Sequence, residues 1–255
     1  MTPLPLRTWL DGKPPPGEGA AGTTAVVIDV LRASTTAATA LAHGAAYVVA
    51  RTDLDEAFAA RGELERRGEE PILGGERRGF KVPGFDLGNS PLEYAPARVS
   101  GKPLILCTSN GTAALERCRD ASRLYAASFV NAGATAAAVA KAPQPVTICC
   151  AGKEGAPSLE DVCCAGLIAT LLLDNYAYET DDATALALLC WENYKRDVTR
   201  LLKGCSHGRY LHSLGFERDL EFCGRVDAFA VAAAQNGAAK LIAVTDLRPR
   251  GRHGR

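Results

Sequence analysis

The chain has 255 residues, long enough for one large domain or two small ones with a sizeable core. Apolar residues make up 47% and charged residues 23%, the proportions of an ordinary soluble globular protein. The 29 basic and 29 acidic residues cancel, so the sequence gives no electrostatic reason to bind nucleic acid or an anionic membrane.

The nine cysteines and the two ends of the chain indicate a reduced, cytoplasmic protein. The cysteine total is odd, two pairs are adjacent (149–150 and 163–164), and no CxxC spacing suggests a zinc or redox motif. The N-terminus lacks the apolar core of a signal peptide, and no apolar run reaches the ~18 residues that span a membrane. We expect residues 1–22 to form a proline-rich extended entry, with an extended segment around 4–10, and residues 248–255 a disordered basic tail.

Strand-like and helix-like patterns alternate along most of the chain. In order, we predict a strand at 24–30, a helix at 34–42, a strand at 46–50, a helix at 54–67, a strand at 103–107, a helix at 112–119, a strand at 123–126, a helix at 132–140, a strand at 146–150, helices at 158–173, 183–202 and 227–235, and a strand at 241–244. Such alternation is typical of parallel βαβ units, so we expect a layered α/β/α fold with a mostly parallel sheet. Residues 23–247 would form this domain, with a candidate boundary between two α/β subdomains near 141–145.

Residues 74–91, GGERRGFKVPGFDLGNSP, interrupt this alternation. Five glycines and two prolines in eighteen residues leave neither the helical nor the strand period intact. Phe80 and Phe85 would anchor the segment to the body of the protein. A long irregular segment inside a compact domain is usually functional when it is ordered, so we predict a binding loop here.

Three turns that follow predicted strands share a small, polar composition: residues 29–36 (DVLRASTT), 108–112 (TSNGT) and 151–155 (AGKEG). Ligands of open parallel sheets bind beyond the carboxyl ends of the strands, so we expect the three turns to lie at one sheet edge. Each turn opens a helix, and helix N-termini suit phosphate or carboxylate. Ordinary capping by Ser or Thr explains any one turn alone, but three together favour an anion site.

Acidic residues near these turns supply the oxygen ligands that Mg²⁺ prefers. The candidates are Asp29, Glu76, Asp86, Glu160 and Asp161. Asp29 is best placed, because an acid at the end of a buried strand is costly unless it is paired or bound to metal. Ser158 and Asp161 also match a capping box, which is a structural alternative for Asp161. Spacing alone does not say which acids converge.

Several familiar phosphate chemistries are excluded. The chain has no G-x-x-x-x-G-K-[ST] phosphate loop and no G-x-S-x-G nucleophile turn. The one C-x5-R match, Cys190 to Arg196, contains no glycine and lies in a predicted helix, so it cannot wrap a phosphate. Asp29 lacks the second acid two residues on that haloacid-dehalogenase-type phosphatases carry. His207 and His212 are candidates for proton transfer, with a solvated or core histidine as the alternative.

Taken together, six segments resemble the 2-phosphosulfolactate phosphatase family, known as ComB. They are DVLRASTT (29–36), GERRGFKVPGFDLGNSP (75–91), TSNGT (108–112), ASFVNA (127–132), CAGKEGAPSLEDVCCAG (150–166) and CSHGRYLHSLGFERDLEFC (205–223). The resemblance covers nearly the whole chain between its two tails. It implies a Mg²⁺-dependent phosphatase that converts 2-phospho-3-sulfolactate to 3-sulfolactate and phosphate on the route to coenzyme M. Similar proteins occur where coenzyme M is not expected, which leaves room for a different phosphoester.

The resemblance also implies roles for individual residues. The implied metal ligands are Asp29, Glu76, Glu160 and Asp161. The implied phosphate cradle is made by Ser34, Thr35, Ser109, Asn110, Gly111 and Thr112. A second anionic group such as a sulfonate would meet Arg77, Arg78, Lys81 or Asn89. Asp29, Arg32 and His207 are the implied catalytic residues, with Arg32 suited to bidentate anion binding and His207 a candidate to protonate the leaving alkoxide.

Two other functions stay open at this point. One is a non-catalytic module that binds a phosphorylated metabolite at the same sheet edge, and the other is a lyase or mutase acting on a phospho-acid. Release of inorganic phosphate that EDTA abolishes and Mg²⁺ restores would distinguish the phosphatase from both. In each case we expect a small anionic phosphoester as the partner, with a homo-oligomer as a candidate assembly.

Overall fold

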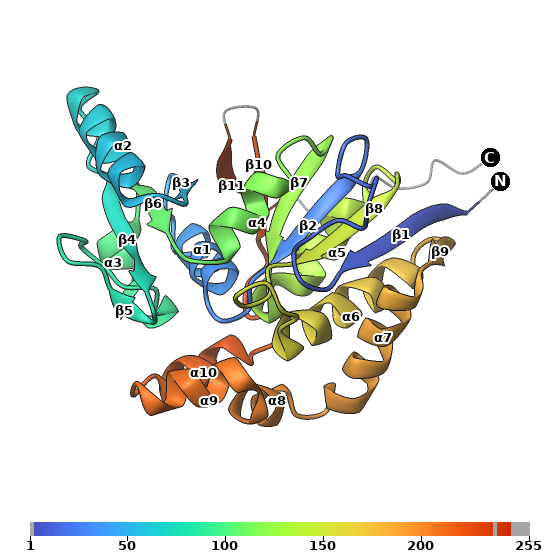
Figure 1. Ribbon diagram of the computed structural model, residues 1–255. Helices are drawn as coiled ribbons and strands as arrows, with labels where there is room; N and C mark the ends of the chain where they lie inside the picture. Colours follow the sequence, from blue (N-terminus) through green and yellow to red (C-terminus); the bar gives the residue numbers. More distant parts are fainter. Residues whose placement is uncertain (1–2, 237–238, 246–255) are drawn as a thin grey trace.

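A computed structural model of the chain describes residues 3–236 and 239–245. One eleven-stranded sheet runs through this part of the chain and carries helices on both sides (Figure 1). The predicted layered α/β fold with a mostly parallel sheet is therefore confirmed. The basic tail predicted at 248–255 lies outside the described residues. No helix in the described ranges has the length and apolar character needed to cross a membrane.

The strands form a sheet whose order differs from their order in the chain. They are β1 (Leu4–Trp9), β2 (Thr24–Ile28), β3 (Tyr47–Arg51), β4 (Ile72–Arg77), β5 (Phe80–Lys81), β6 (Pro103–Cys107), β7 (Arg123–Ala127), β8 (Val146–Cys150), β9 (Tyr178–Thr180), β10 (Ala232–Gln235) and β11 (Lys240–Val244). Across the sheet the order is β5-β4-β6-β3-β11-β10-β7-β2-β8-β1-β9. The predicted extended segment near the N-terminus is thus a strand of the sheet, and β8, after the candidate boundary at 141–145, pairs with both β2 and β1.

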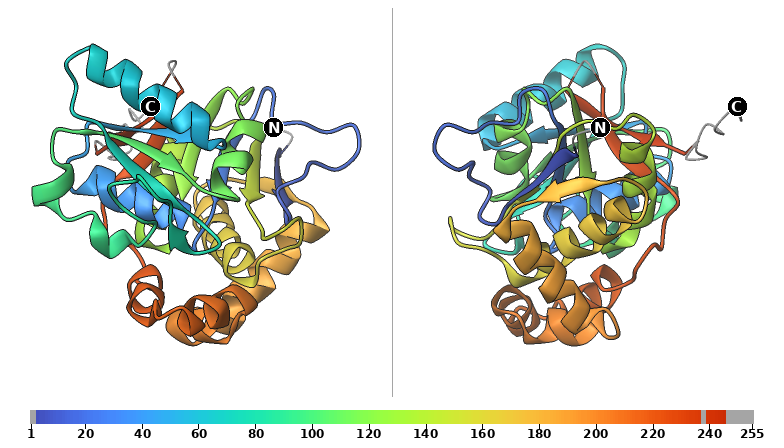
Figure 2. Two further views of the ribbon diagram at one scale, coloured as in Figure 1. Left: turned by 60° about the vertical axis from the view of Figure 1, so that its left-hand side comes forward. Right: turned by 90° about the vertical axis from the view of Figure 1, so that its right-hand side faces the viewer.

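The helices fill the spaces between strands and form a separate group near the C-terminus. They are α1 (Ala33–Ala42), α2 (Leu54–Arg66), α3 (Pro96–Val99), α4 (Gly111–Arg117), α5 (Ala132–Ala140), α6 (Leu159–Leu173), α7 (Asp182–Tyr194), α8 (Val198–Gly204), α9 (Ser206–Ser213) and α10 (Glu217–Cys223), with short 3₁₀ turns at Pro91–Glu93 and Phe129–Asn131. Helices α8, α9 and α10 lie together on one side of the sheet (Figure 2).

The sheet contains two parallel blocks joined by an antiparallel pair. Strands β4, β6 and β3 are parallel to one another, and so are β7, β2, β8, β1 and β9. Between the blocks, β10 and β11 are antiparallel to each other and to their outer neighbours β7 and β3. Three successive reversals mean that the two blocks run in opposite directions. The expectation of a single parallel edge carrying all three polar turns is therefore wrong.

Helices α1 and α4 lie between the two parallel blocks (Figure 1). Helix α1 contacts strands of both blocks, and α4 contacts β2 and β3. Alternate residues of β2 serve different cores, because successive side chains of a strand point to opposite faces. Val26 and Ile28 pack in the core that contains α5 and α6, whereas Ala25 and Val27 pack in the core that contains α1 and α4. Burial on both faces explains why β2 reads as an unbroken apolar run.

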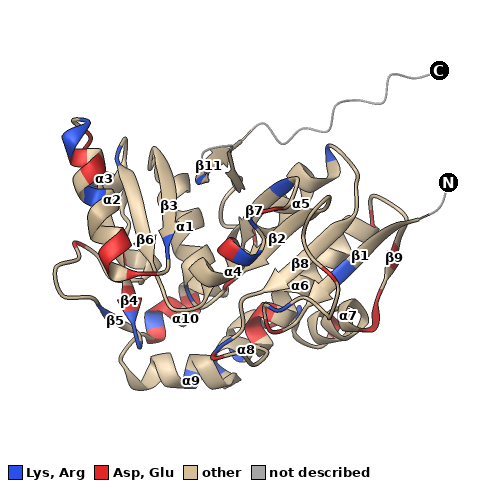
Figure 3. Ribbon diagram, turned by 45° about the horizontal axis from the view of Figure 1, so that its top comes forward, with Lys and Arg blue, Asp and Glu red and all other residues tan. Residues whose placement is uncertain are grey.

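The nine cysteines belong to this packing. All nine are free thiols and eight are buried. The buried cysteines act as small core side chains. Charged residues of both signs are interspersed over the rest of the fold, for example along α2 (Figure 3).

Two sequence predictions about the elements are wrong, and some elements were not predicted. The alanine-rich segment predicted as a helix at 227–235 ends in strand β10, because pairing with β7 and β11 outweighs its helix propensity. The single helix predicted at 183–202 is two helices, since the Asp197 side chain accepts a hydrogen bond from the amide of Arg200 (2.9 Å) and starts α8 anew. Strand β9 and helices α9 and α10 were not anticipated.

The glycine-rich segment 74–91 is more regular than its composition indicates. It begins inside strand β4, turns at Arg78–Gly79 and continues as β5. Gly74 and Gly75 occupy β4 because larger residues do not fit there. A Cβ at Gly75 would lie 1.9 Å from the carbonyl oxygen of Cys107, and one at Gly74 would lie 2.1 Å from the hydroxyl of Tyr94. These two glycines therefore allow close packing between strand β4 and its neighbours.

Candidate active site

A cavity of about 260 Å³ lies where the polar turns meet the β4–β5 hairpin and helix α9. Its lining residues are Asp29, Leu31, Arg32, Glu76, Arg78, Gly79, Asn89, Thr108, Ser109, Asn110, Lys153, Glu154, His207, Tyr210 and Leu211. All three predicted turns contribute to it, and so does the predicted binding loop. The structure thus brings together residues that the sequence places up to 182 positions apart, from Asp29 to Leu211.

Asp29 lies directly after β2 and is held by the turn that follows it. Its Oδ1 accepts a hydrogen bond from the amide of Ala33, and its own amide donates to Oγ of Ser34, both at 3.1 Å. The hydroxyl of Thr35 donates to the carbonyl of Val30 at 2.8 Å. Ser34 and Thr35, predicted as phosphate ligands, are therefore engaged in bracing the turn and do not line the cavity.

The electrostatic surroundings of Asp29 are unusual for a carboxylate. Burial raises the pKa of Asp29 to about 6, and the charges of Glu76 and Glu160 add to the rise while nearby His207 opposes it. Oδ2 of Asp29 has no hydrogen-bond partner among residues 3–236 and 239–245. This carboxylate is therefore poorly compensated by the protein alone.

Asp161 and Glu160, at the start of α6, lie behind the cavity wall. Oδ1 of Asp161 accepts from the amide of Val30 (2.8 Å) and Oδ2 accepts from the amide of Gly152 (3.1 Å), so Asp161 ties the turn after β2 to the turn after β8. Burial, followed by the charge of Glu160, raises the pKa of Asp161 well above its usual value. Oε1 of Glu160 is 3.3 Å from Nδ1 of His207, which lines the cavity from α9.

Glu76 links the β4–β5 hairpin to the turn after β6. Its Oε2 accepts from the amide of Gly79 at 2.7 Å, and its Oε1 accepts from the amide and the hydroxyl of Ser109, each at 3.1 Å. Glu76 is 9% exposed and lines the cavity. These hydrogen bonds place Glu76 against the strand-end turn after β6.

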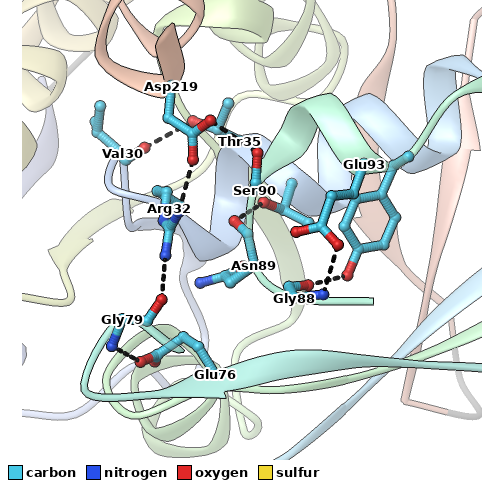
Figure 4. A network of polar contacts seen from close by, with 12 residues as sticks. Val30, Arg32, Thr35, Glu76, Gly79, Gly88, Asn89, Ser90, Glu93 and Asp219 are labelled. Carbon is cyan, nitrogen blue, oxygen red and sulfur yellow. Dashed lines mark hydrogen bonds and ion pairs between the residues drawn. The ribbon is translucent and has the colours of Figure 1, made fainter. Parts of the chain in front are cut away.

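Arg32 is buried and fixed on several sides (Figure 4). Its Nη1 donates to Oδ2 of Asp219 at 2.6 Å, and its Nη2 donates to the carbonyl of Gly79 at 3.1 Å. Its guanidinium carbon lies 4.2 Å from the ring centre of Phe216. Oδ1 of Asp219 also accepts from the hydroxyl of Ser90 at 2.7 Å. Sequence reasoning missed Asp219, although it lies in the last of the six family-like segments.

Two cations line the outer part of the cavity. Nζ of Lys153 lies 4.5 Å from the ring centre of Tyr210, whose hydroxyl donates to the carbonyl of Arg78 at 3.0 Å. Neither Lys153 nor the Arg78 side chain has an ion-pair partner among the residues that the structure describes. Arg78 was one of several sequence candidates. Lys153 was given no role, although its place in the turn after β8 was a usable signal.

Other predicted anion ligands point elsewhere. Arg77 donates to the carbonyls of Thr52 (2.8 Å) and Glu76 (2.9 Å), and with Lys81 it lies outside the cavity lining. Thr112 also lies outside the lining, since its hydroxyl donates to the carbonyl of Thr108. Neighbouring residues of a tight turn point in opposite directions, which composition alone cannot resolve.

Two buried polar groups in the cavity wall have no hydrogen-bond partner among the residues that the structure describes. They are Oδ1 of Asn89 and Oγ1 of Thr108, on residues that are 5% and 2% exposed. Both residues line the cavity. Because a buried polar atom without a hydrogen bond is costly, these groups are suited to meet a polar ligand. Thr108 was missed as a site residue, although it is the first residue after β6.

The donor set fits a magnesium ion held by few side chains. In the described part of the chain, no group of three or more His, Cys, Asp or Glu residues is arranged to hold a metal. The four predicted ligands therefore do not form one closed set. Mg²⁺ is usually held by one or two carboxylates, with water and substrate phosphate completing its shell. Asp29 and Glu76 face the cavity and supply such carboxylates.

A mixed-charge cavity built from strand-end turns of an α/β fold is typical of enzymes that act on small, highly charged substrates. Comparison with known families identifies the group. A family model described as 2-phosphosulpholactate phosphatase matches residues 14–238, and the chain belongs to this family. The resemblance predicted from the sequence is thereby confirmed.

Individual relatives agree with this assignment. A protein of Symbiobacterium thermophilum is 43% identical over 219 residues, which cover 85% of this chain and 93% of the relative. Relatives from Caldicellulosiruptor saccharolyticus and a Cyanothece strain are 39% and 38% identical over 80% and 89% of this chain, and over 85% and 94% of their own lengths. All three are named as probable 2-phosphosulfolactate phosphatases. The family and these names indicate a phosphoric monoester hydrolase.

Proposed function

We propose that the protein hydrolyses 2-phospho-3-sulfolactate, or a phosphorylated acid of closely similar charge, to phosphate and the hydroxy acid, with Mg²⁺ bound in the cavity. The observation that carries this proposal is the charge of the cavity wall. Three acidic residues (Asp29, Glu76 and Glu154) and three basic residues (Arg32, Arg78 and Lys153) share one cavity of about 260 Å³. Such a wall can hold a cation and an anion side by side.

The need for a divalent cation follows from the position of the acids. A phosphate dianion that entered the inner cavity would meet the buried carboxylates of Asp29 and Glu76, which repel it. In this proposal Asp29 and Glu76 would hold Mg²⁺, and the buried charges of Glu160 and Asp161 would strengthen the attraction from behind the wall. When bound, Mg²⁺ supplies neutralisation of the charge on the phosphoryl oxygens.

The phosphoryl group is placed against the inner wall. Arg32 has five N–H donors, of which Asp219 and Gly79 engage two. The remaining donors, the side-chain NH2 group of Asn89 and the hydroxyl of Thr108, which has no partner among the described residues, would form a donor surface for the phosphoryl oxygens. Of the six residues predicted as the phosphate cradle, Ser109 and Asn110 line the cavity, whereas Ser34, Thr35, Gly111 and Thr112 do not.

The outer cations select the rest of the substrate. Lys153 and Arg78 both contact Tyr210, one through the ring and the other through its carbonyl, so both lie around the same side chain. A sulfonate or carboxylate on the substrate would find two cations there that have no ion-pair partner in the described part of the chain. This arrangement supports a substrate that carries a second strong anion in addition to the phosphate.

Proton transfer is assigned to His207. Water attacks phosphorus, the bond from phosphorus to the ester oxygen breaks, and the leaving alkoxide needs a proton. Nδ1 of His207 faces Glu160, which leaves Nε2 available to the leaving oxygen in the cavity. Glu160 thereby orients the ring, in addition to any contribution to the charge of the metal site.

The test is a comparison of matched variants at limiting Mg²⁺. Asp29→Asn and Glu76→Gln should each lower phosphate release strongly, whereas Glu63→Gln, an exposed acid on α2, should leave it unchanged. Wild-type activity in both cavity variants would refute the metal assignment. Tight binding of the phosphoester without turnover would instead support a binding module, and a rearranged product without free phosphate would support a mutase.

A further inference from the structure

Asp219 joins helix α10 to the cavity, although 187 residues separate it from Arg32 in the sequence. The two side chains form an ion pair with an Nη1–Oδ2 distance of 2.6 Å, and they are only 1% and 3% exposed. Both carboxylate oxygens are engaged, since Oδ1 accepts the hydroxyl hydrogen of Ser90 at 2.7 Å. Asp219 is therefore fixed in orientation as well as in position.

A buried ion pair of this kind contributes little net free energy to the stability of a fold. Removing two charges from water costs several kcal/mol per ion, and apolar replacements are often as stable. What such a pair provides is geometry, because a short charge-assisted hydrogen bond fixes the direction of a planar guanidinium. In this pair the fixed direction of the guanidinium bears on the site, because Arg32 lines the cavity.

Three groups hold the Arg32 guanidinium, and two of them come from the start of α10. Figure 4 shows the contacts of Arg32 with Asp219 and Gly79. Asp219 engages Nη1, the ring of Phe216 lies 4.2 Å from the guanidinium carbon, and the carbonyl of Gly79 accepts from Nη2. The amide of the same Gly79 donates to Glu76, so the contacts that hold Arg32 extend to a carboxylate that lines the cavity.

We propose that Asp219 is a positioning residue for the reaction: with Phe216 it holds Arg32 so that the unused N–H donors of Arg32 face the phosphoryl group. This inference rests on the proposed function for the identity of the ligand. Helix α10 then serves as the support of a binding residue on a distant turn. Asp219 itself does not touch the substrate, since it is absent from the cavity lining.

A double-mutant cycle tests this assignment, with kcat/KM and the inhibition constant of inorganic phosphate as readouts. Asp219→Asn keeps the shape but removes the charge, and it should lower kcat/KM about 100-fold, the usual cost of misplacing a binding group by about 1 Å. Phosphate inhibition should weaken in the same variant. In an Arg32→Met background the same change should alter kcat/KM by less than about twofold, because a residue that acts only through Arg32 has nothing left to position.

The control and the contrary outcomes are specific. Asp181→Ala removes a helix-capping side chain away from the cavity and should lower Tm without changing kcat/KM. An equal loss of activity from Asp219→Asn in both backgrounds, or a loss of Tm alone, would overturn the proposal.

Two further measurements keep the test decisive. If Asp219→Asn does not fold, Ser90→Ala replaces it, because Ser90 donates to Asp219. Ser90→Ala should lower kcat/KM by a smaller factor, and only when Arg32 is present. An unchanged kcat/KM in both backgrounds would count against the proposal. If the wild type shows no turnover, calorimetric titration with inorganic phosphate across the same four proteins tests the positioning role independently of the proposed reaction.

Discussion

Gly111 offers the sharpest single perturbation of the site, because it packs directly against Asp29. A Cβ added at Gly111 would lie 2.6 Å from Oδ2 of Asp29 and 2.7 Å from Cβ of Ala33. Real Cβ contacts essentially never fall under 3.0 Å, so Gly111→Ala must displace Asp29 by at least about 0.4 Å. Misplacement by about 1 Å costs roughly 100-fold in rate, so a displacement of this size should lower kcat/KM by about tenfold.

The effect on stability should be limited to overpacking, which costs about 1–3 kcal/mol. The interior helix gain of alanine over glycine does not offset it fully, because Gly111 is the first residue of α4. Gly62→Ala is the matched control, since Gly62 lies inside α2 with no atom within 4 Å of the added Cβ, and it should raise Tm slightly without changing activity. Unchanged kcat/KM in folded Gly111→Ala would refute the placement of Asp29 at the reacting centre.

Two further predictions follow from the charges of the site. In the absence of metal, Asp29→Asn should match the wild-type Tm near pH 4 and exceed it above about pH 6. The reason is that the pKa of Asp29 rises from 3.8 to about 6 on folding, so the wild-type folded state loses up to about 3 kcal/mol of stability as pH rises through this window. An equal Tm difference at both pH values would contradict the buried charge. Lys153→Met should raise KM about tenfold for a phosphoester with a second anion and leave p-nitrophenyl phosphate unaffected, because in the proposed binding mode Lys153 would contact only the distal anion. Lys102→Met, in a surface ion pair with Glu70, should change neither, and equal effects of Lys153→Met on both substrates would argue against a distal subsite.

The sequence predicts the layered fold well, because burial leaves a direct trace in the residues. The run from Thr24 to Ile28 is apolar since β2 is covered on both faces, and the alanine-rich α1 and α5 pack closely against the sheet. Tertiary pairing is less visible. Residues 232–235 have a helix-like composition but form strand β10, which completes the sheet between β7 and β11. No local sequence pattern predicts this strand pairing.

The candidate site was predictable in its location and less so in its membership. Asp29 and Asn110 line the cavity as their places after strands indicated, and Glu76 lines it from the glycine-rich segment. The choice between Arg77 and Arg78 depends on a turn at which Arg78 takes a φ of 52°, and only the three-dimensional turn decides which side chain faces the cavity. Asp219 could not be assigned in advance either, because its partner lies 187 residues away.

The central claim, Mg²⁺-dependent hydrolysis in this cavity, is tested most directly by one measurement. Purified protein is treated with EDTA, dialysed and assayed on 2-phospho-3-sulfolactate for both phosphate and 3-sulfolactate, with and without added Mg²⁺. The account predicts equimolar products only after Mg²⁺ is restored, and their loss in Asp29→Asn. Full hydrolysis without Mg²⁺, or none with it, would contradict the account.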